Sequence, residues 1–242
     1  MEQDNKLIRS LIESSRKGNN NAFEQLFRIH VGYVFAISIR LLANFEDAYD
    51  NTSKIFLEAW KSMSMVRRDA SFILWLKAIA IYSSLQRIRD KDKSKKDKTD
   101  QVPNRKGLNF LDQEIISLPD SERIVLVLND IEHYQKEEIS DLLSISKDEV
   151  ENLLNNARET IMNTLVIKSH DALERAMKQI PESLEPAQNL FERISADMLK
   201  NMPDKNEKTE IIKDMDDEIH EGNLKQEKKK FSLKDLFKKK DN

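Results

Sequence analysis

The sequence of 242 residues contains no cysteine, only 4 glycines and 5 prolines, and 7% aromatic residues. Without cysteine the chain has no disulfides, no cysteine-based zinc site and no thiol catalysis. Residues that interrupt helices are scarce, whereas Leu, Ile, Glu, Lys and Ala, which favour helices, are abundant. The composition therefore predicts an all-α protein.

Two further features are missing at the sequence level. No uninterrupted apolar run reaches the length of about 18 residues that a membrane-spanning helix needs. The first ten residues, MEQDNKLIRS, lack the basic-then-apolar order of a signal peptide. These absences predict a soluble, cytoplasmic protein. With 39% hydrophobic and 34% charged residues, the chain is expected to form one or two small cores rather than a single large one.

Enzymatic chemistry is not expected. The 4 histidines are scattered along the chain, which argues against a metal site. No carboxylate pair, phosphate-binding loop or nucleophile arrangement stands above chance spacing. We therefore expect neither catalytic residues nor a cofactor.

Helical periodicity is clear in the first third of the chain. Four segments carry apolar residues on one stripe, and they span residues 5–17, 22–44, 45–63 and 71–91. The second segment has the widest stripe, which is typical of a helix buried on most sides. Together these segments predict a four-helix unit.

Changes in composition divide the chain further. We expect a first helical domain over 1–90, a flexible polar linker over 91–110 and a second helical domain over 111–168. An amphipathic helical extension over 169–202 follows, and then a charged tail over 203–242 that is expected to be disordered.

The second domain contains the pattern of a helix-turn-helix. A short helix, QKEEISDLL, is followed by a corner, SIS, and by a longer helix, KDEVENLLNNARET. Ser146 stands three residues before Glu149, which predicts a capping box at the start of the longer helix.

At this point the sequence resembles the extracytoplasmic-function (ECF) sigma factors of the sigma-70 family. The segment LPDSERIVLVLNDIEHYQKEEISDLLSISKDEVENLLNNARETI is similar to their promoter-recognising domain, sigma region 4. The upstream elements EDAYD, IFLEAW and FILWLKAIA are similar to their first domain, sigma region 2. The resemblance covers about residues 21–164 in family order. It implies a protein that binds core RNA polymerase and directs promoter-specific transcription initiation.

The resemblance also implies two groups of site residues. The expected polymerase-binding residues are Asp47, Asp50, Lys54, Phe56 and Trp60. The DNA-binding residues that the resemblance implies are Arg67, Arg68, Lys77, Arg87 and Arg89 in the first domain. In the second domain the chemistry of the side chains adds Asn152, Asn155 and Asn156 for adenine edges, and Lys147 and Arg158 for phosphate. Core packing is the alternative interpretation of Phe56 and Trp60, and a solvated helix end is the alternative for Arg87 and Arg89.

The second domain departs from the family on its outer face. Residues 111–168 hold 5 Lys and Arg against 13 Asp and Glu, a net charge of −8. Carboxylates near phosphate oppose DNA binding, so this domain is expected to hold DNA weakly or at an atypical element. The alternative is a sigma-like interaction protein that binds polymerase or an anti-sigma factor without recognising a promoter.

The end of the chain carries one more signal. Residues 228–240, KKKFSLKDLFKKK, surround apolar side chains with lysines. This composition suits a peripheral membrane surface, nucleic acid or a partner groove, and a solvated disordered end is the alternative.

Overall fold

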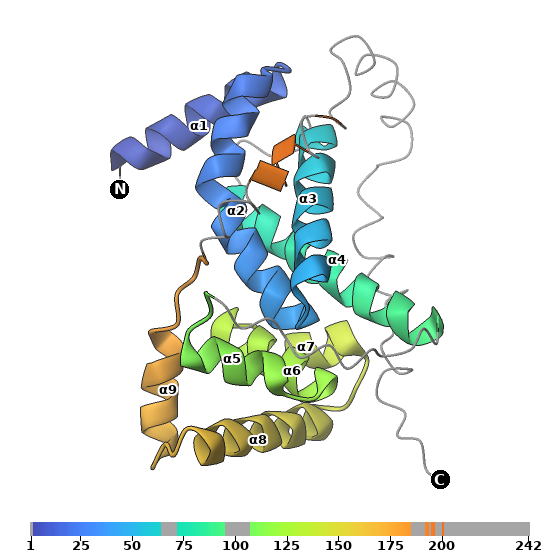
Figure 1. The fold of residues 1–242 in the computed structure, drawn as a ribbon, viewed down its shortest axis with the longest axis vertical. Helices are drawn as coiled ribbons and strands as arrows, with labels where there is room; N and C mark the ends of the chain where they lie inside the picture. Colours follow the sequence, from blue (N-terminus) through green and yellow to red (C-terminus); the bar gives the residue numbers. More distant parts are fainter. Residues whose placement is uncertain are drawn as a thin grey trace. The chain divides into compact units, whose positions relative to one another are not determined.

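The computed structural model describes residues 2–63, 72–94 and 107–184, and five residues further on: Glu192, Arg193, Ser195, Ala196 and Lys200. The described part is all-α and contains no strand (Figure 1). Its elements are α1 Glu2–Arg16, α2 Asn20–Leu42, α3 Phe45–Lys61, α4 Phe72–Ser94, α5 Phe110–Ser117, α6 Asp120–Leu126, η2 Val127–Ile131, α7 Lys136–Leu143, α8 Lys147–Thr164 and α9 His170–Lys178. The predicted tail 203–242, with its basic end at 228–240, lies outside the described residues.

The chain forms two compact units, which are described separately below. Unit 1 takes residues 1–39, 45–84 and 182–216, and unit 2 takes 40–44, 85–181 and 217–242. Helices α2 and α4 each contribute to both units, so the boundaries of the two predicted domains remain predictions.

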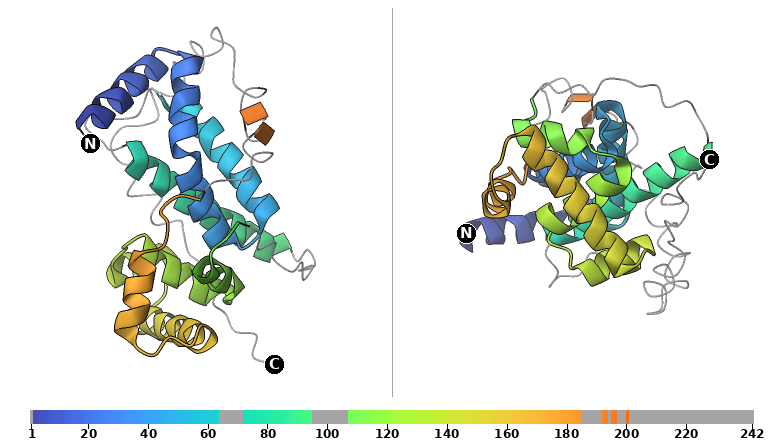
Figure 2. Two further views of the ribbon diagram at one scale, coloured as in Figure 1. Left: turned by 60° about the vertical axis from the view of Figure 1, so that its left-hand side comes forward. Right: turned by 90° about the horizontal axis from the view of Figure 1, so that it is seen from below.

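Unit 1 is built around α2, which lies beside α3 (Figures 1 and 2). The ring centroids of Phe27 on α2 and Phe56 on α3 are 4.9 Å apart in an edge-to-face contact, and those of Phe23 and Trp60 are also 4.9 Å apart. Aromatic pairs in these geometries contribute packing energy beyond the area they bury. The predicted helices 5–17, 22–44, 45–63 and 71–91 are confirmed in type, with small shifts at their ends.

Helix α2 contains no uninterrupted apolar run of 18 residues, as the sequence shows, but it is long and apolar enough on average to span a membrane by length and composition alone. This 23-residue helix contains an 18-residue window with a mean hydropathy of 1.2, the only such helix among the described residues. However, 72% of that window is buried inside the protein. Its apolar residues face the other helices, as expected for a core helix. A buried core helix and a membrane-spanning helix share the same length and apolar composition, so these two properties alone do not distinguish them.

A polar cluster crosses the core of unit 1. The amide nitrogen of Asn51 on α3 donates hydrogen bonds to the hydroxyls of Ser38 on α2, at 3.1 Å, and Ser84 on α4, at 3.0 Å. Its amide oxygen accepts from the Ser83 hydroxyl at 2.6 Å. Buried polar groups are tolerated where they are hydrogen-bonded, and this cluster links three helices at one point.

His30 of α2 gives unit 1 a dependence on pH. Burial is the main cause that lowers its pKa below the ordinary 6.5, and the hydrogen bond that its Nδ1 donates to the Leu26 carbonyl, at 2.8 Å, partly opposes this. The ring therefore stays neutral in the folded protein at a pH where the unfolded chain takes up a proton. The contribution of His30 to the free energy of unfolding is fully present above about pH 6.5. It is lost as the pH falls toward the lower pKa of the folded state.

We predict that the melting temperature of unit 1 falls as the pH is lowered from about 7.5 to about 5.5. In His30→Gln, whose amide can still donate to the Leu26 carbonyl, this fall is expected to be smaller because the titrating group is gone. Thermal unfolding followed by the fluorescence of Trp60 and Trp75, both in unit 1, tests this. Equal pH slopes in the two proteins would contradict it.

Unit 2 contains the helix-turn-helix segment and the first part of the extension. α8 packs against α6 and α7, and α9 packs against α8 and η2. The predicted linker is shorter than expected: residues 91–94 continue α4, and Asn109 caps α5 by accepting a hydrogen bond from the Asp112 amide at 2.8 Å. The remainder, 95–106, lies outside the described residues. Within the predicted extension 169–202, α9 occupies His170–Lys178, and the extent of the extension stays a prediction.

Candidate nucleic-acid and protein interfaces

The accessible face of α3 is acidic. Glu46, Asp50 and Lys54 are exposed, and Asp47 is half-buried. Phe56 and Trp60 are 0% and 1% exposed and lie in the aromatic core of unit 1. These two residues hold α3 in place from inside, which corrects their inclusion among the expected polymerase contacts.

Arg193 of the extension lies on this face of α3. Its guanidinium donates to the Glu46 carboxylate at 2.8 Å, lies 3.7 Å from the Asp50 carboxylate, and stands 4.9 Å from the centre of the Tyr49 ring. The pKa of Tyr49 is raised to about 12, chiefly by burial, while Arg193 acts in the opposite direction. The sequence analysis missed Arg193 because the extension shows only an apolar stripe there, and nothing in it indicates which acids the arginine meets.

The basic residues expected to contact DNA near α4 fall into three places. Arg67 and Arg68 lie outside the described residues. Lys77, in unit 1, is half-buried, with its ammonium 4.0 Å from the Glu182 carboxylate. Arg87 and Arg89, in unit 2, are half-buried near the end of α4, and Arg89 donates to the Gln86 side chain at 2.6 Å.

The helix-turn-helix is formed by α7 and α8. Ser144 ends α7 in the left-handed region, with φ 55°, and this reverses the chain within three residues. The Ser146 hydroxyl then accepts a hydrogen bond from the Glu149 amide at 3.1 Å and begins α8. The cap predicted for Ser146 is therefore confirmed. The inner face of the motif is fully buried and consists of Ile139, Leu143, Val150, Leu154, Ala157 and Ile161.

The outer face of α8 carries a row of amides. Asn152, Asn155 and Asn156 are exposed, and they share one side of the helix because of their spacing of three and four residues. Asn side chains can form paired hydrogen bonds with adenine edges in the major groove. Lys147 is 61% exposed at the start of α8 and pairs with Glu137 at 2.9 Å. An exposed pair of this kind is weak, so Lys147 can turn to a phosphate.

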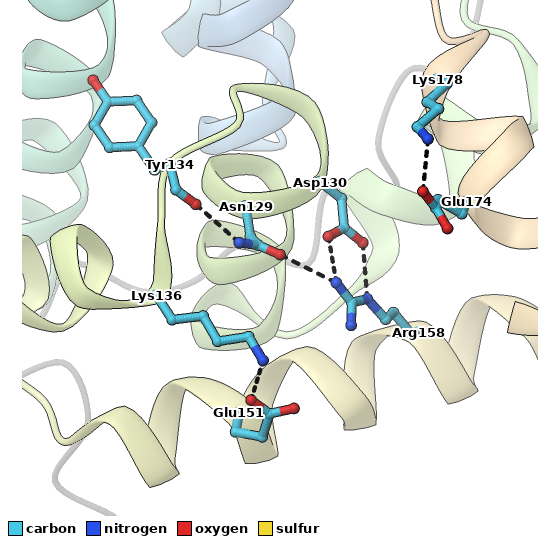
Figure 3. A network of polar contacts seen from close by, with 8 residues as sticks. All are labelled: Asn129, Asp130, Tyr134, Lys136, Glu151, Arg158, Glu174 and Lys178. Atoms are coloured by element: carbon cyan, nitrogen blue, oxygen red, sulfur yellow. Dashed lines mark hydrogen bonds and ion pairs between the residues drawn. The ribbon is translucent and has the colours of Figure 1, made fainter. Parts of the chain in front are cut away.

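Arg158 makes hydrogen bonds within unit 2. Its guanidinium donates two hydrogen bonds to the Asp130 carboxylate of η2, at 2.9 and 2.5 Å (Figure 3). It donates a third, at 3.1 Å, to the Asn129 side chain. The hydrogen bond to Asp130 is the main cause that raises its pKa. Arg158 joins α8 to η2, and its expected contact with phosphate stays a prediction. Lys136 and Glu151 form another pair between α7 and α8.

We predict that Arg158→Met lowers the free energy of unfolding of unit 2 by about 1 to 3 kcal/mol, because it leaves the 12%-exposed Asp130 carboxylate without its charged donor. Lys147→Met removes the same charge from an exposed pair and is expected to leave stability nearly unchanged. Denaturant titration followed by helical circular dichroism compares the two. Equal losses would show that Arg158 does not hold η2.

The comparisons with known proteins agree with this architecture. The chain is 26% identical over 167 residues to the ECF RNA polymerase sigma factor SigW of Bacillus subtilis, covering 57% of this chain and 86% of the relative. It is 25% identical over 164 residues to the RNA polymerase sigma-H factor of Pseudomonas aeruginosa, covering 59% of this chain and 83% of that factor. This chain is a relative of the ECF sigma factors. The resemblance in the sequence analysis is therefore confirmed.

Comparisons with family models and with solved structures gave two further results. No family model matches the chain. Among solved structures, it is similar to the sigma factor RpoE in its co-crystal structure with the anti-sigma factor NepR from Bartonella quintana, with 15% identity, a TM-score of 0.42, and coverage of 61% of this chain and 98% of that one. The curated sigma factors match 57% and 59% of this chain, so a large part of it has no counterpart in those alignments.

Proposed function

We propose that this protein is a sigma factor that binds core RNA polymerase and directs promoter-specific transcription initiation in the cytoplasm. The observation that carries the proposal is the helix-turn-helix of α7 and α8, whose buried inner face is intact and whose outer face presents Asn152, Asn155 and Asn156 to solvent. The sequence similarity to sigma factors supplies the class of partner. The protein acts as a regulator and not as an enzyme.

Each interface has a defined set of residues in this proposal. On α3, the exposed Asp50 and Lys54 and the half-buried Asp47 contact polymerase. Arg67, Arg68, Lys77, Arg87 and Arg89 contact promoter DNA in the first domain, and Lys147 with the three asparagines contacts it in the second. Weak DNA binding by the acidic second domain is compensated by tethering to polymerase, which raises the effective concentration of the promoter at α8.

A second function is favoured by one observation, the net charge of −8 over residues 111–168. In this alternative the protein keeps the fold to bind polymerase or an anti-sigma factor, and α8 makes no contact with DNA. An anti-sigma factor is a partner in either case.

Chromatin occupancy of the tagged protein, measured with copurification of RNA polymerase from the same cells, separates the two functions. Sharp promoter peaks together with polymerase establish a working sigma factor. Copurified polymerase, or another protein, without promoter peaks establishes the alternative. If neither polymerase, nor another partner protein, nor promoters are recovered, both are wrong.

A further inference from the structure

After α9, the chain returns to unit 1. Glu182, Ser183, Leu184 and Arg193 belong to that unit, together with α1, α3 and most of α2. Their contacts involve three of its helices: Leu184 and Ser183 meet α2, Glu182 faces Lys77 of α4, and Arg193 lies on α3. The extension is therefore attached to the surface of unit 1 at more than one point.

The first attachment uses a glycine. The Leu184 amide donates to the Gly32 carbonyl of α2 at 3.1 Å. A Cβ atom on Gly32 would lie 3.0 Å from the Leu184 carbonyl oxygen and 3.2 Å from the Ser183 Cβ. Both distances are shorter than ordinary van der Waals contacts. The absence of a side chain at residue 32 therefore allows Leu184 to approach the backbone of α2. Leu184 is 8% exposed in this position.

The second attachment pairs the positive charge of Arg193 with negative charges on α3. Arg193 contacts Glu46, Asp50 and Tyr49, which are all residues of α3. Two carboxylates and the face of an aromatic ring are the groups that a guanidinium prefers. Arg193 thereby neutralises part of the acidic face that α3 would otherwise present to a partner.

The exposure of these groups indicates how strong the attachment is. The side chains of Arg193 and Asp50 are both 48% exposed, and that of Glu46 is 69% exposed. Ion pairs this open to solvent contribute little each and weaken with salt. Arg193 is thus held on α3 by weak contacts, which a protein partner with a larger interface can displace.

We propose that Arg193 is an internal competitor of core RNA polymerase for the face of α3 formed by Glu46, Tyr49 and Asp50. This inference rests on the proposed function for its polymerase partner. In the free protein Arg193 is paired with the acids of this face, and polymerase binding requires its release. The apparent affinity for polymerase is then reduced by the fraction of molecules in the attached state.

The test begins with the full-length chain and three variants. Arg193→Glu, which repels the α3 acids, and Gly32→Ala, which obstructs Leu184 without changing charge, are both expected to tighten binding to purified core polymerase by about threefold to tenfold. The control is Arg175→Glu, the same charge reversal at an exposed arginine of α9, and it is expected to leave the affinity unchanged. Fluorescence anisotropy of a labelled chain measures all four proteins.

A double-mutant cycle checks that Arg193 acts through α3. Glu46→Arg combined with Arg193→Glu restores opposite charges in reversed order, so its affinity for polymerase is expected to return toward that of the parent, relative to the two single variants. If the effects of the two single substitutions on affinity simply multiply in the double variant, the two residues act independently and the proposed contact is wrong.

A cross-link tests the competition directly. Because the chain has no cysteine, Glu46→Cys with Arg193→Cys creates a single pair of thiols, which a thiol-cleavable bismaleimide can join. The joined form is expected to lose polymerase binding at least tenfold, to about the level of a permanently covered face, and reduction of the linker is expected to restore it. Unchanged binding by the joined form, or failure of the linker to join the two sites, would overturn the proposal.

The outcomes also separate this inference from the proposed function. If cross-linking succeeds and no form of the protein binds polymerase, the sigma-factor function is wrong and the competition falls with it. If the parent binds polymerase and neither Arg193→Glu, Gly32→Ala nor the linker alters its affinity, the function stands and the internal competitor is wrong.

Discussion

Replacing Asp112 with alanine is expected to lower the free energy of unfolding of unit 2 by about 3 to 5 kcal/mol, because the change leaves a buried guanidinium without its counter-charge. In unit 2, Nε of Arg40 donates to Oδ1 of Asp112 at 2.7 Å, and the two side chains are 1% and 0% exposed. The other carboxylate oxygen accepts from the Asn109 amide at 2.7 Å, and Nη2 of Arg40 donates to the Pro181 carbonyl at 2.7 Å. One carboxylate thus joins the end of α2 to the start of α5.

The matching double variant separates the cost of an unpaired charge from the value of the pair. Arg40→Met with Asp112→Leu replaces both charges by apolar side chains and is expected to recover most of the lost stability. Glu174→Ala, which breaks the exposed pair with Lys178, serves as the control and is expected to leave stability nearly unchanged. Hydrogen exchange of the α5 and α8 amides measures unit 2, whose unfolding the tryptophans of unit 1 do not report. A loss below about 1 kcal/mol in Asp112→Ala would contradict the prediction.

Removing the three asparagines of α8 is expected to have the largest effect on function. If Asn152, Asn155 and Asn156 form paired hydrogen bonds with adenines, each good contact contributes about 1 to 3 kcal/mol of discrimination. Three such contacts together contribute at least about 3 kcal/mol, so the triple alanine variant should lower transcription from the cognate promoter by at least about 100-fold in a reconstituted assay. All three side chains are exposed, so folding and polymerase binding are expected to be unchanged.

Two controls sharpen this experiment. Gln179→Ala removes an exposed amide at the end of α9 and is expected to leave transcription unaltered. Asp148→Ala with Glu159→Ala removes two exposed carboxylates from α8 and is expected to raise affinity for DNA without regard to sequence, since less negative charge faces the phosphates. Full activity of the triple asparagine variant would favour the sigma-like interaction protein over the sigma factor.

Several elements were predictable because their signals are local. Helix α2 shows an apolar stripe that is wider than a surface helix needs, and burial on most sides is the result. The start of α8 was predictable because the Ser146 hydroxyl accepts a hydrogen bond from the amide of Glu149, only three residues further on. Both depend on residues within one or two turns of each other, so periodicity and spacing are sufficient.

The site residues were harder to predict because a charged side chain does not carry the identity of its partner. Arg158 and Lys147 both lie on α8 and look equivalent in the sequence. In the structure Arg158 is held by Asp130, 28 residues away, whereas Lys147 stays in solvent at 61% exposure. Phe56 and Trp60 were placed on the correct helix, and their burial corrected the surface role.

The sequence alone determined the helical class, the helix-turn-helix, the acidity of the second domain and the kinship with ECF sigma factors, since composition, periodicity and similarity are properties of the chain itself. Only the tertiary structure decided which charges are buried together and which face solvent. Arg40 meets Asp112 across 72 residues, and Arg193 meets Glu46 across 147. Such pairs form because packing of the helices brings distant segments within a few ångströms, and the energy of each pair is then set by how much water remains around it.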